Sequence, residues 1–470
     1  MTNPDRRSGT KPPRTTRRAF LGSAALAAAS VSILPRHVLA GGDTPPSEKL
    51  NVAGVGVGGM GGHNVELCSG ENIVALCDVD AKGYAAGTIA KYPSAAVYKD
   101  FRVMFDKQKN IDAVIVATPD HSHAIVGMTA IEHGKHVYIQ KPLAHSVYEA
   151  RLLTEAARKH KLATQLGNQG HSTEDTRLIC EWIWDGAIGA VREVHAWTNR
   201  PVWPQGIEVG RPKETPPVPT SLDWDLWIGP AAMRPYHPTY HPGNWRAWWD
   251  FGTGSLGDLG CHILDAPFWA LKLKYPTSVE GCISTYWNDL WKPCPPKNEN
   301  YPRSTIVRYA FPAREGMPEV KLTWWDGGMK PPRPEELEPG MHMGDSDGGV
   351  LFVGDKGSLM CGCYGRSPRL IPATKMKEYK RPKPTIARIP GGEGGHEKDW
   401  LRACKDGKPS SSNFDFSGPL SEMVLMGNLA VRYPDRKLLW DGEKMAVTND
   451  ADANAYVRPQ YRQGWSLEGA

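Results

Sequence analysis

A glycine-rich turn between an apolar run and a stretch of helical character constrains the fold of this chain more than any other feature. Residues 50–55 are apolar, residues 56–61 read Gly-Val-Gly-Gly-Met-Gly, and a helix is expected from there to about residue 69. Glycines at this spacing allow a tight turn, a close approach of the backbone to a pyrophosphate, and close packing of helix on strand. A flexible glycine loop is the alternative, and the flanking strand and helix argue against it. The predicted dinucleotide contacts are Gly56, Gly58, Gly59, Met60 and Gly61.

An acidic residue follows the next apolar run. Residues 73–77 predict a second strand, and Asp78 comes 17 residues after Gly61. A carboxylate at this place hydrogen-bonds the adenosine ribose hydroxyls and repels a 2′-phosphate, which favours NAD over NADP as the cofactor. Asp80 lies close by in the sequence and is an alternative for the same role.

Short apolar runs continue to alternate with helical stretches as far as residue 166. They predict strands at residues 111–117, 136–139 and 162–166, and a helix near residues 122–132 that stops at Gly134. Strands alternating with helices imply an α/β fold, a doubly wound parallel sheet with helices on both faces. We therefore expect a Rossmann domain over residues 48–166.

Two segments directly follow predicted strands of this sheet. Thr118 and Pro119 follow one strand, and Gln140, Lys141 and Pro142 follow the next. A doubly wound sheet binds its ligands at the carboxyl ends of its strands, so Thr118, Pro119, Gln140 and Lys141 are candidate cofactor contacts, and Pro142 fixes the local backbone. The alternative for Lys141 is a solvated surface lysine, the usual fate of this residue type.

Residues 1–40 have the features of an export signal. Arg17 and Arg18 precede an Ala-, Ser- and Gly-rich run at residues 19–34, and residues 38–40 read Val-Leu-Ala. This pattern predicts a twin-arginine signal peptide, export through the twin-arginine machinery, and a periplasmic or envelope location. The run is too short and too weakly apolar for a stable membrane span. An incidental arginine pair in a basic tail is the alternative.

The net positive charge of the chain comes from this predicted signal. Residues 1–40 carry a net charge of +6 and the whole chain +5, so the remainder is close to neutral at −1. The remainder thus offers no charge-based case for binding nucleic acid. The nine cysteines are scattered without metal-ligand spacing, so we expect neither a metal site nor a disulfide framework.

Three blocks of sequence resemble the Gfo/Idh/MocA family, the relatives of glucose-fructose oxidoreductase and inositol dehydrogenase. Residues 117–123 read Ala-Thr-Pro-Asp-His-Ser-His, residues 134–138 read Gly-Lys-His-Val-Tyr, and Lys141-Pro142 follows. Residues 254–265 resemble the Asp-x-x-x-His substrate motif of the family. This chain has Gln140 where the family usually has Glu, which removes one charge beside the lysine.

The resemblance implies a second, α+β domain over residues 167–470, built on an open, mostly antiparallel sheet. One face of that sheet covers the nicotinamide, and the other often carries an oligomer contact, so we expect a homo-oligomer. Residues 191–199, 305–311 and 319–325 have the apolar patterning of its strands. Helices near residues 396–403 and 419–431 are expected to pack back on the body.

Lys141, Asp258 and His262 form the candidate catalytic set. Asp258 and His262 are four residues apart, which places both on one face of a helix. A neutral imidazole accepts a hydroxyl proton, a neighbouring carboxylate orients the ring, and a lysine stabilises alkoxide charge. The resemblance implies the same three roles. The alternative is an ordinary i,i+4 pair on a helix surface, and a metal site lacks further ligands at suitable spacing.

Three further residues are weaker candidates. The resemblance places His123 beside the nicotinamide ribose, where it contacts cofactor or substrate. Asn168 follows the 162–166 strand and is predicted to border the nicotinamide and substrate. Trp245 belongs with Trp248 and Trp249 to a cluster just before the Asp258 helix, suited to stacking on a sugar or to filling a core.

These features predict an NAD-dependent oxidoreductase that acts on a hydroxyl of a sugar, cyclitol or glycoside. Because an envelope compartment offers no obvious soluble NAD pool, the cofactor is expected to stay bound and be recycled in place. The alternative is NAD-assisted glycoside hydrolysis or elimination with no net redox change. A sensor without catalysis is a third possibility, and the retained proton-transfer residues argue against it.

Overall fold

The computed structural model of the chain describes residues 48–206, 210–285, 287–293 and 299–467. The predicted signal at residues 1–40 lies outside these ranges. Residues 50–470 form one compact unit. The described helices include none with the length and apolar character needed to cross a membrane.

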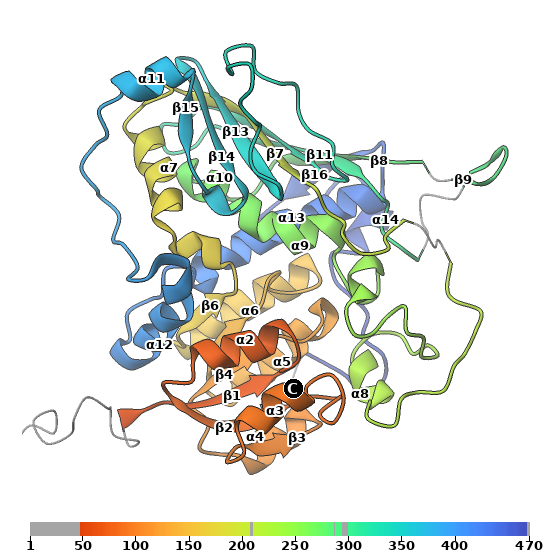
Figure 1. Ribbon diagram of the computed structural model, residues 1–470. Coiled ribbons are helices and arrows are strands. Elements are labelled where there is room, and N and C mark those ends of the chain that lie inside the picture. Colours follow the sequence, from red (N-terminus) through yellow and green to blue (C-terminus); the bar gives the residue numbers. More distant parts are fainter. Residues whose placement is uncertain (1–47, 207–209, 286, 294–298, 468–470) are drawn as a thin grey trace, which may run out of the picture. The chain divides into compact units, whose positions relative to one another are not determined.

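The first half of this unit is a six-stranded parallel sheet (Figure 1). Its strands run in the spatial order β3-β2-β1-β4-β5-β6, the order of a dinucleotide-binding fold. The doubly wound Rossmann fold predicted from the sequence is thereby confirmed. The strands are β1 (Asn51–Val55), β2 (Asn72–Cys77), β3 (Ala96–Tyr98), β4 (Ala113–Val116), β5 (His136–Ile139) and β6 (Thr164–Leu166).

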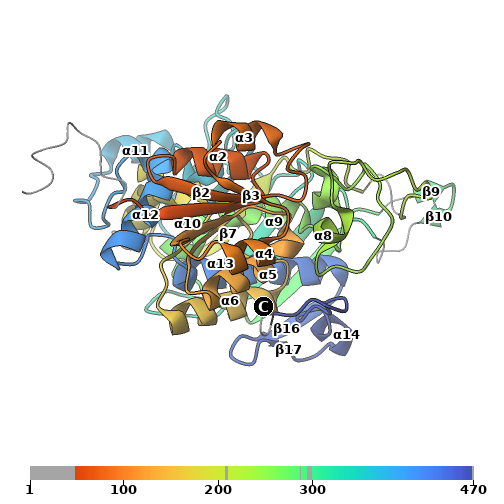
Figure 2. The same cartoon turned by 90° about the horizontal axis from the view of Figure 1, so that it is seen from below.

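Helices cover both faces of the parallel sheet (Figure 2). On one face lie α2 (Met60–Leu67) and α3 (Ala86–Lys91). On the other lie α4 (Phe101–Lys107), α5 (Asp120–Glu132) and α6 (Val147–His160). A capping box starts α6, because the Ser146 hydroxyl accepts from Glu149 N and the Glu149 carboxylate accepts from Ser146 N.

The second half of the unit is built on a nine-stranded sheet in the order β15-β14-β13-β7-β12-β11-β8-β16-β17. The pairing of β12 with β7 is parallel and all its other pairings are antiparallel. The mostly antiparallel sheet predicted from the sequence is confirmed. The strands are β7 (Val191–Thr198), β8 (Ser278–Ile283), β11 (Thr305–Phe311), β12 (Val320–Trp325), β13 (Gly348–Gly354), β14 (Gly357–Gly362), β15 (Arg369–Ile371), β16 (Lys437–Asp441) and β17 (Ala446–Val447). Strands β9 (Trp287–Asp289) and β10 (Lys292–Pro293) form a separate hairpin.

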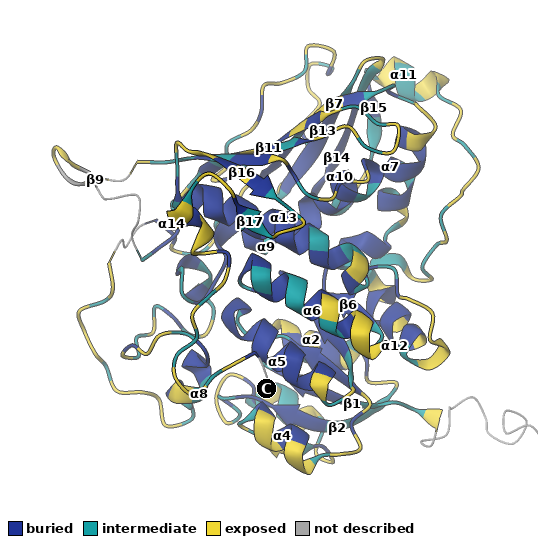
Figure 3. Cartoon of the chain, turned by 180° about the vertical axis from the view of Figure 1, so that it is seen from behind, coloured by how far each residue is buried: buried dark blue, intermediate teal, exposed yellow. Residues whose placement is uncertain are grey.

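A layer of helices lies between the two sheets. The 19-residue α13 (Phe414–Arg432) contacts α6 of the Rossmann half and β8 and β11 of the second sheet. Against α13 packs α9 (Gly254–Ile263), which carries the Asp-x-x-x-His motif. Both helices are almost wholly buried (Figure 3). This layer therefore fixes α9 relative to the parallel sheet. The remaining described helices are α7 (Glu174–Trp184), α8 (Trp224–Ile228), α10 (Asp265–Ala270), α11 (Ala373–Glu378), α12 (His396–Asp406) and α14 (Ala451–Asn454).

The helix predicted near residues 396–403 packs back on the body, where it lies against the Rossmann half. Trp400 and Leu401 of α12 are buried in one cluster with Tyr138 of β5. Glu397, on the same helix, accepts hydrogen bonds from the Asn64 amide at 2.8 Å and the Tyr138 hydroxyl at 3.1 Å. Helix α12, more than 300 residues from α2 in sequence, thus packs against α2, which begins at the predicted cofactor site.

Candidate active site

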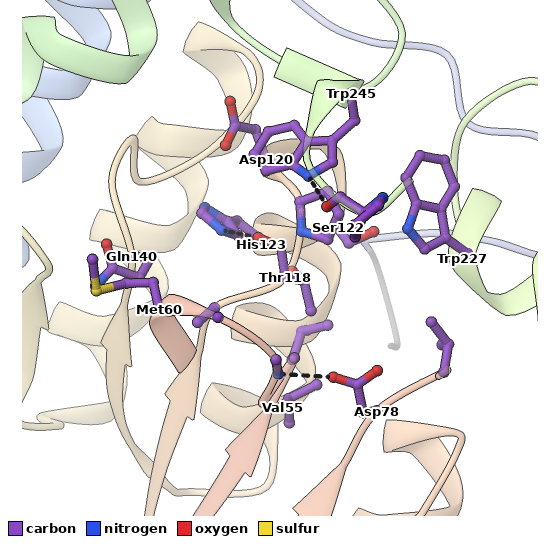
Figure 4. Close-up of a pocket in the computed structure, with 18 of the residues that line it drawn as sticks. Val55, Met60, Asp78, Thr118, Asp120, Ser122, His123, Gln140, Trp227 and Trp245 are labelled. Atoms are coloured by element: carbon purple, nitrogen blue, oxygen red, sulfur yellow. Dashed lines mark hydrogen bonds between the residues drawn. The ribbon is translucent and has the colours of Figure 1, made fainter. Parts of the chain in front are cut away.

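A cleft opens along the carboxyl edge of the parallel sheet, where β1, β2, β4 and β5 end. Its empty space, including open solvent at the mouth, is about 1350 Å³. Figure 4 shows part of its lining. The residues predicted from the sequence that line it are Gly56, Gly58, Gly59, Met60, Asp78, Thr118, Pro119, His123, Gln140, Lys141, Trp245 and Asp258.

The glycine turn leaves no space for side chains. Gly56 has φ +75°, and a Cβ there would lie 2.7 Å from Thr118 N. A Cβ on Gly61 would lie 1.9 Å from the Gly56 carbonyl oxygen, so α2 packs directly against the turn. No side chain caps the N-terminus of α2, which begins at the cleft. Its first N–H groups are placed to bind the charge of a pyrophosphate.

Asp78 holds the glycine turn from the neighbouring strand. Its Oδ2 accepts from Val57 N at 2.8 Å and from Gly58 N at 3.2 Å, and its Oδ1 accepts from Asp80 N at 2.8 Å. Burial raises the pKa of Asp78, and these three N–H donors oppose that rise. A carboxylate has about four acceptor positions, so capacity remains for a ribose hydroxyl. Its alternative, Asp80, accepts from Tyr84 N and contacts His241 at 3.2 Å.

Lys141 and Asp258 meet in the cleft, although they are 117 residues apart in sequence. The Lys141 ammonium donates to Asp258 Oδ1 and to the Asp258 backbone oxygen, each at 2.7 Å. Only 16% of the Lys141 side chain and 13% of the Asp258 side chain are exposed, so water screens this pair weakly. An ammonium group has three donors, which leaves one for a substrate oxygen.

Two arginines complete the surroundings of Asp258. Arg246 Nε donates to Asp258 Oδ1 at 3.4 Å, and Arg200 Nε lies 3.6 Å from Asp258 Oδ2. Burial raises the pKa of Asp258, but the positive charges of Lys141, Arg246 and Arg200 outweigh burial and hold this pKa well below its usual range. The carboxylate is therefore ionised at every ordinary pH. The sequence patterns did not identify either arginine, because neither stands in a recognisable motif.

His262 lies on α9 one turn beyond Asp258 and is 5% exposed. Among the described residues its Nδ1 is buried without a hydrogen-bond partner, and its ring centroid is 4.6 Å from that of Tyr364. Burial and the nearby Lys141 charge lower the pKa of His262 far below its usual value, against the opposing effect of Asp258. The ring is therefore neutral near pH 7.

The segment after β4 is fixed by His123 and Asp120. Each ring nitrogen of His123 lies 2.8 Å from a backbone oxygen, one of Pro142 and one of Thr118, so the ring ties the two strand-end turns together. The Thr253 hydroxyl donates to Asp120 Oδ2 at 2.5 Å and joins the residue before α9 to the start of α5. Thr118 Oγ1 is buried with no partner in the described part of the chain, and it lines the cleft.

The structure explains why Gln140 replaces the usual acid. Gln140 Nε2 donates to Asn64 Oδ1 at 2.9 Å, and Asn64 in turn donates to Glu397. A carboxylate at position 140 has no hydrogen to donate to Asn64. The acid of this network stands instead on α12, as Glu397, which is 3% exposed.

The three tryptophans of the predicted stacking cluster lie in different surroundings. Trp245 lines the cleft, with the Arg246 guanidinium 4.3 Å from its ring centroid. Trp248 is 1% exposed and donates to the Thr239 oxygen, and Trp249 lines a different cavity. Trp227 and Trp465, which the sequence patterns did not single out, line the cleft in their place.

Asn168 does not line the cleft. Its side chain is fully buried, where Nδ2 donates to Asp265 Oδ1 at 3.1 Å and Oδ1 accepts from the Ser412 hydroxyl at 2.7 Å. Asp265 also binds the His171 ring at 2.9 Å. Asn168 thus belongs to a buried polar network behind α9, and its predicted contact with substrate has no support in this arrangement.

Metal-binding groups do not gather in the described residues, which contain no set of three or more His, Cys, Asp or Glu side chains placed to hold a metal ion. Eight of the nine cysteines are described and free, and six of these are buried.

Two parts of the chain match models of known protein families. Residues 50–168 match the model described as "Oxidoreductase family, NAD-binding Rossmann fold", and residues 196–281 match "Oxidoreductase family, C-terminal alpha/beta domain". Both are domains of the Gfo/Idh/MocA family. The resemblance drawn from the three sequence blocks is thereby supported, and the Rossmann half is an NAD-binding domain of this type.

The curated relatives of these domains include two kinds of enzyme. The chain is 32% identical over 158 residues to inositol 2-dehydrogenase of Rubrobacter xylanophilus, which covers 32% of this chain and 44% of that protein. It is 29% identical over 164 residues to glycosyl hydrolase family 109 protein 2 of Akkermansia muciniphila, covering 32% and 34%. The matches thus span less than half the length of these relatives.

Solved structures share the fold over most of the chain. Levoglucosan dehydrogenase in complex with NADH aligns with a TM-score of 0.53 and 18% identity, covering 82% of this chain and 98% of the other. The WlbA dehydrogenase of Bordetella pertussis in complex with NADH and UDP-GlcNAcA aligns with a TM-score of 0.56 and 14% identity, covering 84% and 99%.

Proposed function

We propose that the protein is an NAD-dependent oxidoreductase that acts on a hydroxyl group of a sugar, cyclitol or glycoside. The observation that carries this proposal is the partly buried Lys141–Asp258 pair near the neutral His262, at the carboxyl edge of an NAD-binding sheet. The dehydrogenases among its relatives support the same reaction class.

Each residue of the site has a separate role in the oxidation of a substrate hydroxyl group. NAD, when bound, supplies the acceptor for the hydride that leaves the carbon. The hydroxyl proton passes to a ring nitrogen of His262, which is unprotonated near pH 7. The free donor of Lys141 stabilises the alkoxide as its charge develops, and Asp258 keeps Lys141 charged and in place.

Two further elements of the proposal come from the N-terminal sequence. The twin-arginine pattern of residues 1–40 supports export of the folded protein to the periplasm or envelope. A cofactor carried through export must be regenerated without leaving, by a second carbonyl substrate or by return of the hydride to an intermediate. A homo-oligomer remains part of the proposal, by analogy with the family.

NAD-assisted glycoside cleavage is a second candidate, because relatives named glycosyl hydrolase family 109 match the chain. In that reaction transient oxidation acidifies a neighbouring C–H, elimination releases the aglycone, and the hydride returns. The retained lysine-proline and Asp-x-x-x-His motifs favour the ordinary dehydrogenase.

The experiment that tests the proposal starts from protein purified without added cofactor. Denaturation and quantification of the released dinucleotides measure what the protein carries, and the native protein is then titrated with sugars, cyclitols and glycosides. Reduced-nicotinamide absorbance that rises with one sugar or cyclitol supports the dehydrogenase. Release of an aglycone without a net absorbance change supports the cleavage reaction, and protein that binds no NAD(H) contradicts both.

A further inference from the structure

The last part of the chain crosses from the second sheet to the Rossmann half (Figures 1 and 2). Residues 455–467, which we call the C-terminal strap, follow α14. Tyr148 N in the first turn of α6 donates to the Val457 oxygen at 3.1 Å, and Val457 is 4% exposed. The Tyr461 hydroxyl bonds to the buried Glu149 carboxylate. The strap is therefore anchored on α6 before it reaches the cleft.

Arg462 ties the strap to α8, which forms one wall of the cleft. Its guanidinium donates to Asp225 Oδ1 at 2.7 Å, to the Asp225 oxygen at 2.9 Å and to the Gly229 oxygen at 2.6 Å. Arg462 N also donates to the Pro230 oxygen at 3.0 Å. A single residue thus makes four hydrogen bonds to the helix and the turn that follows it.

Trp465 carries the strap into the cleft. Its ring centroid lies 6.2 Å from that of Phe101, and the Arg102 guanidinium lies 4.5 Å from the same ring. The indole lines the cleft together with Val79, Lys99, Phe101 and Leu226. These residues come from the ends of β2 and β3, from α4 and from α8, so the strap closes a space bounded by both halves of the molecule.

The place of this aromatic space in the cleft identifies the group that fits it. In a sheet of this strand order the pyrophosphate binds over the β1 turn, and the acid after β2 binds the adenosine ribose. Lys141 lies on the β5 side of that turn, whereas Phe101 and Trp465 lie on the β3 side, beyond Asp78. The next group along the ligand on that side is the adenine base, whose flat π-face stacks on aromatic side chains.

We infer that the C-terminal strap builds the adenine-binding slot of the dinucleotide site, with Trp465 contacting the base, and that it slows release of the dinucleotide. This inference rests on the proposed function for its ligand. A base packed against Trp465 and Phe101 leaves only when the indole moves. The contact of the indole with Arg102 and the four hydrogen bonds of Arg462 oppose this movement. A strap of this kind would serve an enzyme that retains its cofactor.

The test measures the rate at which the full-length protein releases NADH. Protein loaded with NADH is mixed rapidly with excess NAD, and the fluorescence of the reduced nicotinamide is followed. The Trp465→Ala variant is expected to release NADH about tenfold faster or more, from the loss of one base–indole stack. Trp465→Phe is expected to lie between the variant and the wild type, and Trp287→Ala, an exposed indole in β9 outside the cleft, to match the wild type.

Two further arms make the test specific to adenine. Arg462→Ala, which keeps the indole but loosens the strap, is also expected to release NADH faster. Reduced nicotinamide mononucleotide, which lacks the adenosine half, is expected to leave wild type and Trp465→Ala at equal rates. If wild type binds NADH and Trp465→Ala and Arg462→Ala release it at the wild-type rate, the strap inference is overturned while the proposed function stands. If wild type binds no NADH, both fall.

Discussion

The two ends of the cleft use different physical means. The Lys141 end is built from buried charges, with one carboxylate held among three cations. The Trp465 end is lined by aromatic rings, and the Arg462 guanidinium, 19% exposed, holds the strap there by donating to Asp225 and to the Gly229 oxygen. Buried charge stabilises a charge that develops during reaction, whereas flat apolar surface holds a ligand without changing it. The difference predicts that changes at the Lys141 end alter turnover and changes toward the Trp465 end alter dinucleotide affinity.

Loss of the Lys141 ammonium tests this division with the largest expected effect. Lys141→Ala is expected to lower kcat about 10²–10⁴-fold, because the proton-transfer set loses its cationic member. The affinity for NADH is expected to change little. Steady-state kinetics and fluorescence titration measure the two quantities, with Lys107→Ala, an exposed lysine of α4, as the control. Full turnover in Lys141→Ala would contradict the site.

Crowding the glycine turn tests the middle of the cleft. In Gly61→Ala the new Cβ meets the Gly56 oxygen, so the turn must shift. We expect the free energy of unfolding to fall by about 1–3 kcal/mol and NADH affinity to fall at least tenfold. Gly87 of α3 is the matched control, because a Cβ there meets nothing within 4 Å, and Gly87→Ala is expected to gain up to about 1 kcal/mol. Unchanged NADH binding in Gly61→Ala would remove the turn from the site.

Asp78 tests the ribose contact and the choice of dinucleotide. Asp78→Asn is expected to weaken NADH binding about tenfold, since a hydrogen bond to a charged group contributes about 1.5 kcal/mol or more. NADPH binding is expected not to weaken, because the repulsion of the 2′-phosphate is removed at the same time. Parallel titrations with the two dinucleotides measure the change. An equal loss for both would assign Asp78 only to holding the glycine turn.

The pH dependence tests the electrostatics of the Lys141 end and has the smallest expected effect. Burial and Lys141 lower the pKa of His262, so the neutral ring persists below its usual pKa of 6.5. We expect kcat/KM to stay constant as pH falls to 6.5 and to decrease only at lower pH, where the ring protonates. The unfolded chain binds this proton near pH 6.5 and the folded chain does not, so His262 also makes the protein less stable as pH falls below 6.5. An acid limb at or above pH 6.5 would contradict this environment.

The sequence predicted the features that are local and missed those that depend on distant packing. The glycine turn, its flanking strand and helix, and Asp78 lie within 30 residues, and their spacing alone indicates their arrangement. The parallel sheet was predicted except for β3, whose three residues are too few to show a pattern. Motifs located Lys141 and Asp258 separately, and the resemblance joined them.

Other contacts could not be read from the sequence. Arg200 and Arg246 contact Asp258 only because β7 and the segment before α9 converge on it. Trp465 stands in no motif, and it reaches the cleft only because the strap packs on α6 and α8. Asn168 was predicted as a substrate contact from its place after a strand, but Asp265 and Ser412 bind its side chain in the interior. Turn residues after a strand end point to the ligand or to the core, and the sequence does not distinguish these directions.

The most direct test of the account is a crystal structure of the full-length protein with NADH bound. We predict the nicotinamide beside Lys141 and His262, the pyrophosphate on the turn at residues 56–61, a ribose hydroxyl on Asp78, and the adenine packed against Trp465 and Phe101. NADH bound in the reverse direction, or outside this cleft, would contradict it.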